Sequence, residues 1–385
     1  MKSLTKILKW LIGVPLAIWL LLYITGYDYI LKGVRVVYLT GHTTAYIDDY
    51  VHFDNRSIQH KNPKPTPKHP KFNTAEMTLR LQQINEDLQT VAFLIYKDNQ
   101  LWFENYADGY GVESHTNSFS MAKSITTMLL GRAIEDGFVE SLGQKVIDFL
   151  PELKGAYAQE VTMGDLASMA SGLNWDENYY SPFSMTAQAY YDKNIRKLIM
   201  GLRIEEAPGK KFKYLSGSTQ LLGMALEKAL PENLSVYLSQ HFWQPMGMEN
   251  YALWQLDGIA SGMEKTYCCI ASNARDFAKV GLLYLNQGNY NGKQYLDSTF
   301  VQQSIQPRFK DSPEYGYGFW LSEHEGKSVF VMQGILGQYV MGIPEDNVLI
   351  VRLGHQREEK PSGAPFPNDF YVYLEDAYAM LKANQ

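Results

Sequence analysis

Four short apolar runs separated by tight turns lie near the C-terminal end of the chain. They read YGYGFWLS, SVFVMQG, QYVMGIP and VLIVRLG, and they fall between residues 315 and 354. Runs of this length, each bounded by turn residues, are typical of strands joined by hairpins, and such strands pair antiparallel. We therefore expect an antiparallel sheet, covered by a final helix in FYVYLEDAYAMLKA, residues 370–383.

A second strand pair is expected far upstream, at residues 91–109. There two apolar runs surround Asp98-Asn99-Gln100, the pattern of a hairpin. Apolar spacing predicts a helix over 74–88, and a long helical stretch separates the hairpin from the C-terminal strands. The pattern predicts an α+β fold, in which strands from both ends form one sheet flanked by helices and a helical lobe lies between its halves.

The N-terminus predicts a membrane anchor. Lys2, Lys6 and Lys9 precede Trp10–Tyr27, which contains no charged residue. At 1.5 Å per residue, this segment spans about 27 Å, close to the thickness of a bilayer core. Lysines before such a segment favour a cytoplasmic N-terminus. We expect residues 1–9 in the cytoplasm, an uncleaved transmembrane helix over 10–27, and the rest in the periplasm or outside the cell.

Residues 28–72 are expected to connect the anchor to a catalytic domain over 73–385. Four prolines alternate with lysines between Pro63 and Lys71, a composition typical of an extended linker. The stretch GHTTAYIDD, residues 41–49, has two interpretations: an ordered strap or a flexible spacer.

Composition excludes some functions. The net charge is −6, which gives no indication of nucleic-acid binding. Two cysteines occur, Cys268 and Cys269, and neighbours rarely satisfy disulfide geometry. We expect two small buried apolar side chains rather than a disulfide or a zinc site. The sequence does not indicate an oligomeric state.

The stretch NSFSMAKSITTMLLG, residues 117–131, contains the pattern Ser-x-x-Lys. Its apolar spacing predicts a helix that begins near Ser120 and carries Lys123 one turn on. N–H groups at a helix start can stabilise an oxyanion, and a buried lysine with a lowered pKa can take a hydroxyl proton. The competing interpretation is a serine N-cap followed by a solvated lysine. A second copy, Ser3 to Lys6, precedes the predicted anchor and is not expected to be catalytic.

Several other segments, taken in order, make the chain resemble the serine β-lactamase and penicillin-binding-protein superfamily. The resemblance is strongest to the class C-related branch of esterases and 6-aminohexanoate-dimer hydrolases, and it runs from about residue 74 to 380. Besides the stretch around Ser120, it is carried by VTMGDLASMASGLNWDE, APGKKFKYLSGSTQLLG, SNARDFAKVGLLYLNQGNYNGK and MQGILGQYVMGIPEDNVLIVRLG. No GxSxG, HExxH, Walker A or GxGxxG pattern is present.

The resemblance implies a role for particular residues. Ser120 would be the acylated nucleophile, Lys123 its base, and Tyr214 the group that passes the proton to the leaving group. Ser216 would complete that hydrogen-bond network, because Tyr214-Leu215-Ser216 matches the family's Tyr-x-Asn/Ser motif. The rival motif Tyr179-Tyr180-Ser181 ranks second, with Tyr180 expected to line the pocket. The N–H groups of Ser120 and Ile335 would form the oxyanion hole.

One position departs from the family pattern. The third motif, Lys-Thr-Gly or His-x-Gly, falls on Met332-Gln333-Gly334, so the cation that holds a substrate carboxylate is missing. Gln333 could offer a neutral amide, and Gly334 would allow close approach of the strand. We therefore expect a serine hydrolase that needs no metal or organic cofactor and acts on a small ester or amide. The alternatives are a D-alanyl peptidase or β-lactamase, and a non-catalytic protein that binds peptidoglycan or a partner.

Overall fold

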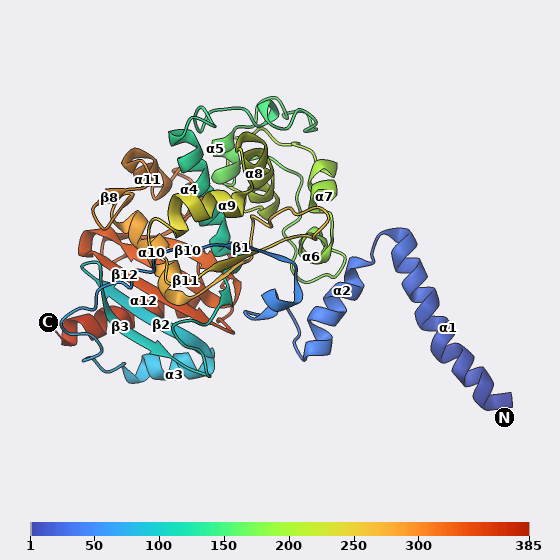
Figure 1. Ribbon diagram of the computed structural model, residues 1–385, viewed down its shortest axis with the longest axis horizontal. Helices are drawn as coiled ribbons and strands as arrows, with labels where there is room; N and C mark the ends of the chain where they lie inside the picture. Colours follow the sequence, from blue (N-terminus) through green and yellow to red (C-terminus); the bar gives the residue numbers. More distant parts are fainter. Residues whose placement is uncertain (1, 385) are drawn as a thin grey trace.

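A computed structural model describes residues 2–384, with side chains from residue 10 onward. Strands from both ends of the chain form a six-stranded antiparallel sheet in the order β3-β2-β12-β11-β10-β9 (Figure 1). The strands are β2 Thr90–Lys97, β3 Gln100–Tyr106, β9 Trp320–His324, β10 Lys327–Gly334, β11 Gln338–Ile343 and β12 Val348–Gly354. The expected sheet and hairpin are confirmed. Asp98 and Asn99 form the hairpin turn, and both have positive φ, as the tight turn requires.

Helices cover both faces of this sheet. Helices α3 (Leu79–Asp87) and α12 (Asn368–Ala383) lie on one face, and α10 (Ala274–Leu285) lies on the other. Successive strand residues alternate between the two cores: Phe93 and Ile95 pack with α12, whereas Leu94 joins the core shared with α10. Helix α3 begins five residues later than predicted, because Thr78 caps it by accepting a hydrogen bond from Leu81 N–H.

The helical lobe lies between the two halves of the sheet in sequence, as expected. It contains α4 Ala122–Glu135, α5 Met163–Ala167, α6 Met185–Tyr191, α7 Ile195–Gly201, α8 Ser216–Ala229, α9 Leu234–Leu238, the turns η3 Phe119–Met121 and η4 Val146–Asp148, and the π-helical turn η5 Ser239–Trp243. The remaining elements near the sheet are the short pair β7 Asn289–Tyr290 and β8 Lys293–Gln294, helix α11 Ser298–Ser304, and the turns η6 Ile335–Gly337 and η7 Pro344–Asp346.

A second, smaller sheet joins the N-terminal segment to the lobe. Its strand order is β1-β5-β6-β4, formed by β1 Asn55–Ile58, β5 Ala252–Gln255, β6 Ile270–Ser272 and β4 Thr116–Asn117. Strand β1 precedes the predicted domain start at residue 73, yet it pairs along its length with β5. Residues 28–54 add α2 Tyr29–Val36 and the turns η1 Tyr38–Thr40 and η2 Asp49–His52.

The structure supports an ordered strap for residues 41–49. Ile47 and Asp49 are fully buried, and the Ile47 carbonyl accepts a hydrogen bond from Asn117 N–H. The proline-rich stretch also follows the domain surface, because Leu101 N–H donates to the carbonyl of Pro67. A flexible spacer would not bury these groups, so the strap interpretation of residues 41–49 is the one that fits.

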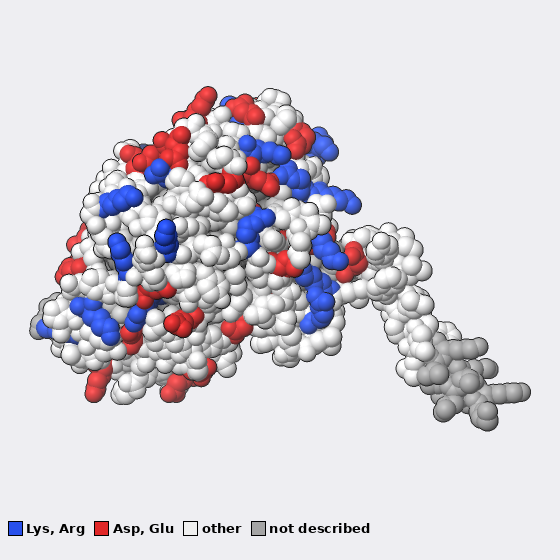
Figure 2. Space-filling model, in the orientation of Figure 1, with Lys and Arg blue, Asp and Glu red and all other residues white. Residues whose placement is uncertain are grey.

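Helix α1, Lys2–Thr25, extends away from the body of the molecule (Figure 1). Its described side chains cover residues 10–25; they are uncharged and largely exposed (Figure 2), with Trp10 at 72%. Within the described part of the chain, no helix is long and apolar enough to span a membrane. The anchor predicted over residues 10–27 is therefore unsupported, and the predicted cytoplasmic end, residues 1–9, lies outside the residues whose side chains are described.

Candidate active site

Ser120 lies in the turn η3, which leads directly into helix α4. The side chain of Lys123, one turn further on, donates a hydrogen bond of 2.9 Å to the Ser120 hydroxyl. The first N–H groups of a helix have no acceptor within the helix and carry partial positive charge. The predicted pair is thus brought together at a helix start, where an anion can be stabilised.

Lys123 is 2% exposed, which excludes the interpretation of a solvated helix lysine. Its ammonium also donates to the carbonyl of Tyr267 at 2.7 Å. Burial lowers the pKa of Lys123 to about 8, although the Glu177 carboxylate opposes this shift. A lysine with this pKa is partly neutral near physiological pH, so it can accept a proton from Ser120.

Tyr214 lies beside this pair. Its ring is 5.1 Å from the Lys123 ammonium and 5.1 Å from the ring of Trp320. Burial raises the pKa of Tyr214, and the Glu177 charge raises it further, whereas a hydrogen bond with Ser120 lowers it. The phenol therefore keeps its proton and can donate it to an atom near the Ser120 oxygen.

Ser216 is hydrogen-bonded to Glu177, a residue that the sequence did not indicate as part of the site. Its N–H and hydroxyl each donate to the Glu177 carboxylate at 2.6 Å. Because Ser216 is the first residue of α8, this carboxylate caps a helix N-terminus, where negative charge is favourable. Ser216 thus holds the Glu177 carboxylate, and the charge of this carboxylate acts on the pKa of Tyr214 and of Lys123. The sequence WDENYY contains no local signal that distinguishes Glu177 from its acidic neighbour Asp176.

The rival tyrosine motif is placed differently from expectation. The side chain of Tyr180 is 99% exposed and does not line the cavity next to Tyr214, so its expected place in the pocket is not observed and stays a prediction. The neighbouring Tyr179 hydroxyl donates to Glu177. The end of this loop is held at the start of α6 by two hydrogen bonds. Thr186 donates to the Asn178 carbonyl, and the Ser184 and Thr186 hydroxyls bond to each other.

Strand β10 brings the third motif against the nucleophile's turn. A Cβ on Gly334 would lie 2.3 Å from the Ser118 carbonyl oxygen, so only glycine allows this close approach. Ile335 follows directly in η6, and strand β10 itself contacts the turn that carries Ser120. The side-chain oxygen of Gln333 is buried and unpartnered among the described residues. Gln333 and Gly334 therefore lie on strand β10 as expected, whereas Ile335 lies in the turn η6 rather than on the strand.

A cavity of about 420 Å³ opens next to Tyr214 rather than over Ser120 itself. Its walls come from the loop after α5, from the segment before α8, and from Tyr214. The lining residues are Gly172, Asn174, Trp175, Asp176, Glu177, Glu205, Glu206, Lys213, Tyr214 and Leu215. Tyr214 is the residue that this cavity shares with the surroundings of Ser120 and Lys123.

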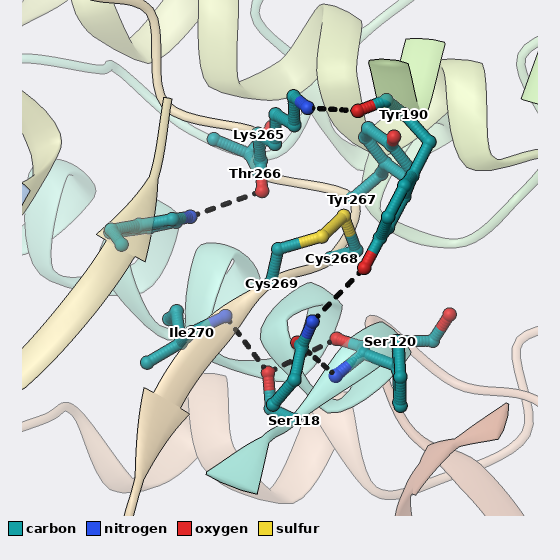
Figure 3. The surroundings of a disulfide bond; sticks show 12 residues. Ser118, Ser120, Tyr190, Lys265, Thr266, Tyr267, Cys268, Cys269 and Ile270 are labelled. Atoms are coloured by element: carbon teal, nitrogen blue, oxygen red, sulfur yellow. Dashed lines mark hydrogen bonds between the residues drawn. A yellow bond between two sulfur atoms is a disulfide. The ribbon is translucent and has the colours of Figure 1, made fainter. Parts of the chain in front are cut away.

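The two cysteines correct an expectation. Cys268 and Cys269 form a disulfide, contrary to the prediction from their adjacency, although both are buried as expected (Figure 3). The chain accommodates the bond because Cys269 adopts a φ of +78°, a left-handed conformation. The disulfide directly follows Tyr267, whose carbonyl holds Lys123, and precedes Ile270, which pairs with Ser118.

Comparison with known proteins gives several relatives. The 6-aminohexanoate-dimer hydrolase of Paenarthrobacter ureafaciens is 22% identical over 314 residues, which cover 75% of this chain and 79% of that protein. A Bacillus anthracis structure described as a candidate 6-aminohexanoate-dimer hydrolase superposes with a TM-score of 0.73 at 22% identity, covering 85% of this chain and 90% of that one.

A family VIII carboxylesterase superposes with a TM-score of 0.61 at 15% identity, covering 82% of this chain and 98% of that one. At these identities the superpositions show the fold, and the fold is the one that the sequence resemblance implies. The sequence pattern of the Beta-lactamase family matches residues 77–368, most of the chain. The protein is therefore a serine hydrolase that belongs to the beta-lactamase family.

Proposed function

We propose that this enzyme hydrolyses small esters or amides through an acyl-enzyme on Ser120. The observation that carries the proposal is the buried Lys123, whose pKa is lowered to about 8 and whose amine lies 2.9 Å from the Ser120 hydroxyl. A buried lysine beside a serine at a helix start has the geometry of an activated nucleophile.

In the first half-reaction, neutral Lys123 accepts the Ser120 proton while Oγ bonds to the substrate carbonyl carbon. The N–H groups of Ser120 and Ile335 stabilise the resulting oxyanion. The bond to the leaving group then breaks, and the proton passes through Tyr214 to the departing oxygen or nitrogen. Water attacks the acyl-enzyme in the second half-reaction, and the proton it releases restores the Ser120 hydroxyl.

Gln333 favours substrates without a carboxylate next to the scissile bond. The cation of the family's third motif falls on Met332 in this chain, so the neutral Gln333 amide is the polar side chain that the motif retains. The names of the relatives, a 6-aminohexanoate-dimer hydrolase and a carboxylesterase, agree with amide and ester chemistry. A Met332→Lys variant should gain activity on esters that carry such a carboxylate, whereas Met332→Leu should not. Equal behaviour of both variants would contradict this account of selectivity.

The first test is labelling of the full-length protein by a fluorophosphonate, followed by intact mass measurement. We expect one adduct on the wild type, none on Ser120→Ala, and slow labelling of Lys123→Ala. Panels of short-chain esters and amides then compare turnover. A folded wild type that stays unlabelled would favour the non-catalytic binding protein. A stable adduct with penicillin would favour the D-alanyl peptidase.

The location of the enzyme is a separate proposal. We propose that the chain is exported and remains attached to a membrane through its N-terminal segment. The support is the lysine-flanked apolar stretch and the exposure of its side chains, since an apolar surface of this kind marks a contact with a partner or a membrane. Full-length protein should sediment with membranes and be cut by protease added to intact spheroplasts. A form lacking residues 1–27 should remain in the supernatant.

A further inference from the structure

The turn that presents Ser120 is strained and needs support from outside. Phe119 has a φ of +46°, which is costly for a bulky side chain. Its N–H donates to the side-chain oxygen of Asn117 at 3.0 Å, and this bond holds the residue in place. Strain of this kind persists only where the surrounding structure enforces it.

Asn117 is itself held by two groups from distant parts of the chain. It is fully buried, and its side-chain amide donates to the Asp49 carboxylate at 3.0 Å and to the Tyr190 hydroxyl at 3.1 Å. Tyr190 in turn donates to the second Asp49 oxygen at 2.7 Å. Figure 3 shows Tyr190 reaching from the lobe towards the turn that carries Ser118 and Ser120.

Asp49 belongs to the strap, residues 41–49, and it is 0% exposed. Burial raises its pKa to about 6, against the opposing effects of Tyr190, Asn117 and the buried Lys265. A buried carboxylate is costly unless each oxygen is paired, and here each oxygen accepts one side-chain hydrogen bond. These bonds fix the orientation of the Asn117 amide, so its oxygen faces the Phe119 N–H.

We propose that Asp49 of the N-terminal strap is a positioning residue for Ser120, acting through Asn117 and the strained Phe119. The inference rests on the proposed role of Ser120 as the nucleophile. It assigns a catalytic purpose to a segment that precedes the matched family region, residues 77–368. The strap thus supports the turn that carries the nucleophile through the side chain of Asn117.

The neighbouring strap carboxylate provides a matched control. Among the described residues, Asp48 accepts a hydrogen bond from Tyr110 and makes none with Asn117. Asp48→Asn therefore changes the same charge in the same segment without changing the support of Ser120. Asp49→Asn leaves one acceptor oxygen where Asn117 and Tyr190 need two.

The experiment compares full-length wild type, Asp49→Asn and Asp48→Asn at a temperature where all three are folded by circular dichroism. We expect Asp49→Asn to lower both kcat and the fluorophosphonate labelling rate by about 10- to 100-fold with little change in KM, as for misplacement of a reacting group. Asp48→Asn should stay within about twofold of the wild type, as expected when no supporting contact of the site changes.

An exchange of partners separates positioning from loss of stability. In Asp49→Asn/Asn117→Asp, the new carboxylate can accept from both Phe119 N–H and the new amide, and Tyr190 can donate to the amide oxygen. We expect this double variant to recover most of the labelling rate lost by Asp49→Asn. Equal labelling rates for the wild type and Asp49→Asn would overturn the inference. An unlabelled wild type would instead overturn the proposed function.

Discussion

The site has two walls, which differ in how far their side chains are buried and hydrogen-bonded. The nucleophile wall consists of residues 117–123, the strap carboxylate Asp49 and the Tyr267 carbonyl; its side chains are almost all buried, and its polar side chains are hydrogen-bonded. The loop wall, residues 172–183, contains exposed side chains such as Tyr180 and borders the open cavity. The difference indicates that the reaction is determined at the first wall and substrate preference at the second.

This comparison predicts the largest losses on the nucleophile wall. Lys123→Ala should lower kcat/KM for ester hydrolysis by about 10³- to 10⁴-fold, because it removes the base. In the wild type, kcat/KM should rise with pH through about 8, as burial-lowered Lys123 loses its proton. A pH–rate profile of free enzyme measures this. A flat profile across this range would contradict Lys123 as the base.

The same lysine gives a stability signature with a definite sign. Its pKa is about 8 in the folded protein against 10.5 for an ordinary lysine. Between these pH values the unfolded chain binds the proton and the folded chain does not, so the free energy of unfolding should rise with pH. Urea titrations of the wild type and Lys123→Ala test this, and the rise should be smaller in the variant, where Lys265, whose pKa burial also lowers, still contributes.

Tyr214 lies where the two walls meet, and its replacement should have the next largest effect. Tyr214→Phe keeps the ring against Trp320 but removes the proton that goes to the leaving group. We expect a loss of about 100-fold on amides and a much smaller loss on p-nitrophenyl esters, whose leaving group needs no proton. Equal losses on both substrates would show that Tyr214 acts in another way.

Glu177 connects the loop wall to the chemistry, and its effect should be moderate. Its charge raises the pKa of both Lys123 and Tyr214. Glu177→Gln can still accept from Ser216, so the main result should be a shift of the acidic limb of the pH–rate profile to lower pH. Glu205→Gln, in the same cavity, serves as the control and should leave the limb in place. If the acidic limb does not shift in Glu177→Gln, the charge of Glu177 does not act on the pKa of the base.

The smallest effect is expected for Tyr180. Because this side chain is almost fully exposed, Tyr180→Ala should change kcat/KM for a small ester by less than about twofold, as for surface substitutions away from special features. Steady-state kinetics on short and long acyl chains measure this. A loss confined to long acyl chains would mean that the loop wall closes over larger substrates, and the contrast between the walls would then hold only for small ones.

The sequence predicted the parts of this protein that depend on local pattern. Alternating and turn residues indicated the strands and the hairpin at Asp98-Asn99, and apolar spacing placed Ser120 at a helix start with Lys123 one turn on. It missed Glu177 and the strap carboxylate Asp49, because a single acidic residue in a loop carries no local signal of its partner. Adjacency argued against a disulfide at Cys268 and Cys269, yet the left-handed backbone at Cys269 permits it.

By itself, then, the sequence determined the fold class, the family resemblance and the candidate pair Ser120 and Lys123, since these follow from residue types at fixed spacing. Only the tertiary structure decided that Lys123 is buried, that the Glu177 carboxylate lies against Ser216, and that Asp49 is the strap residue that supports the nucleophile. Those outcomes depend on burial and on contacts between residues far apart in the chain, such as Asp49 and Asn117 or Glu177 and Ser216. The pKa of Lys123 depends in the same way on the elements packed around it.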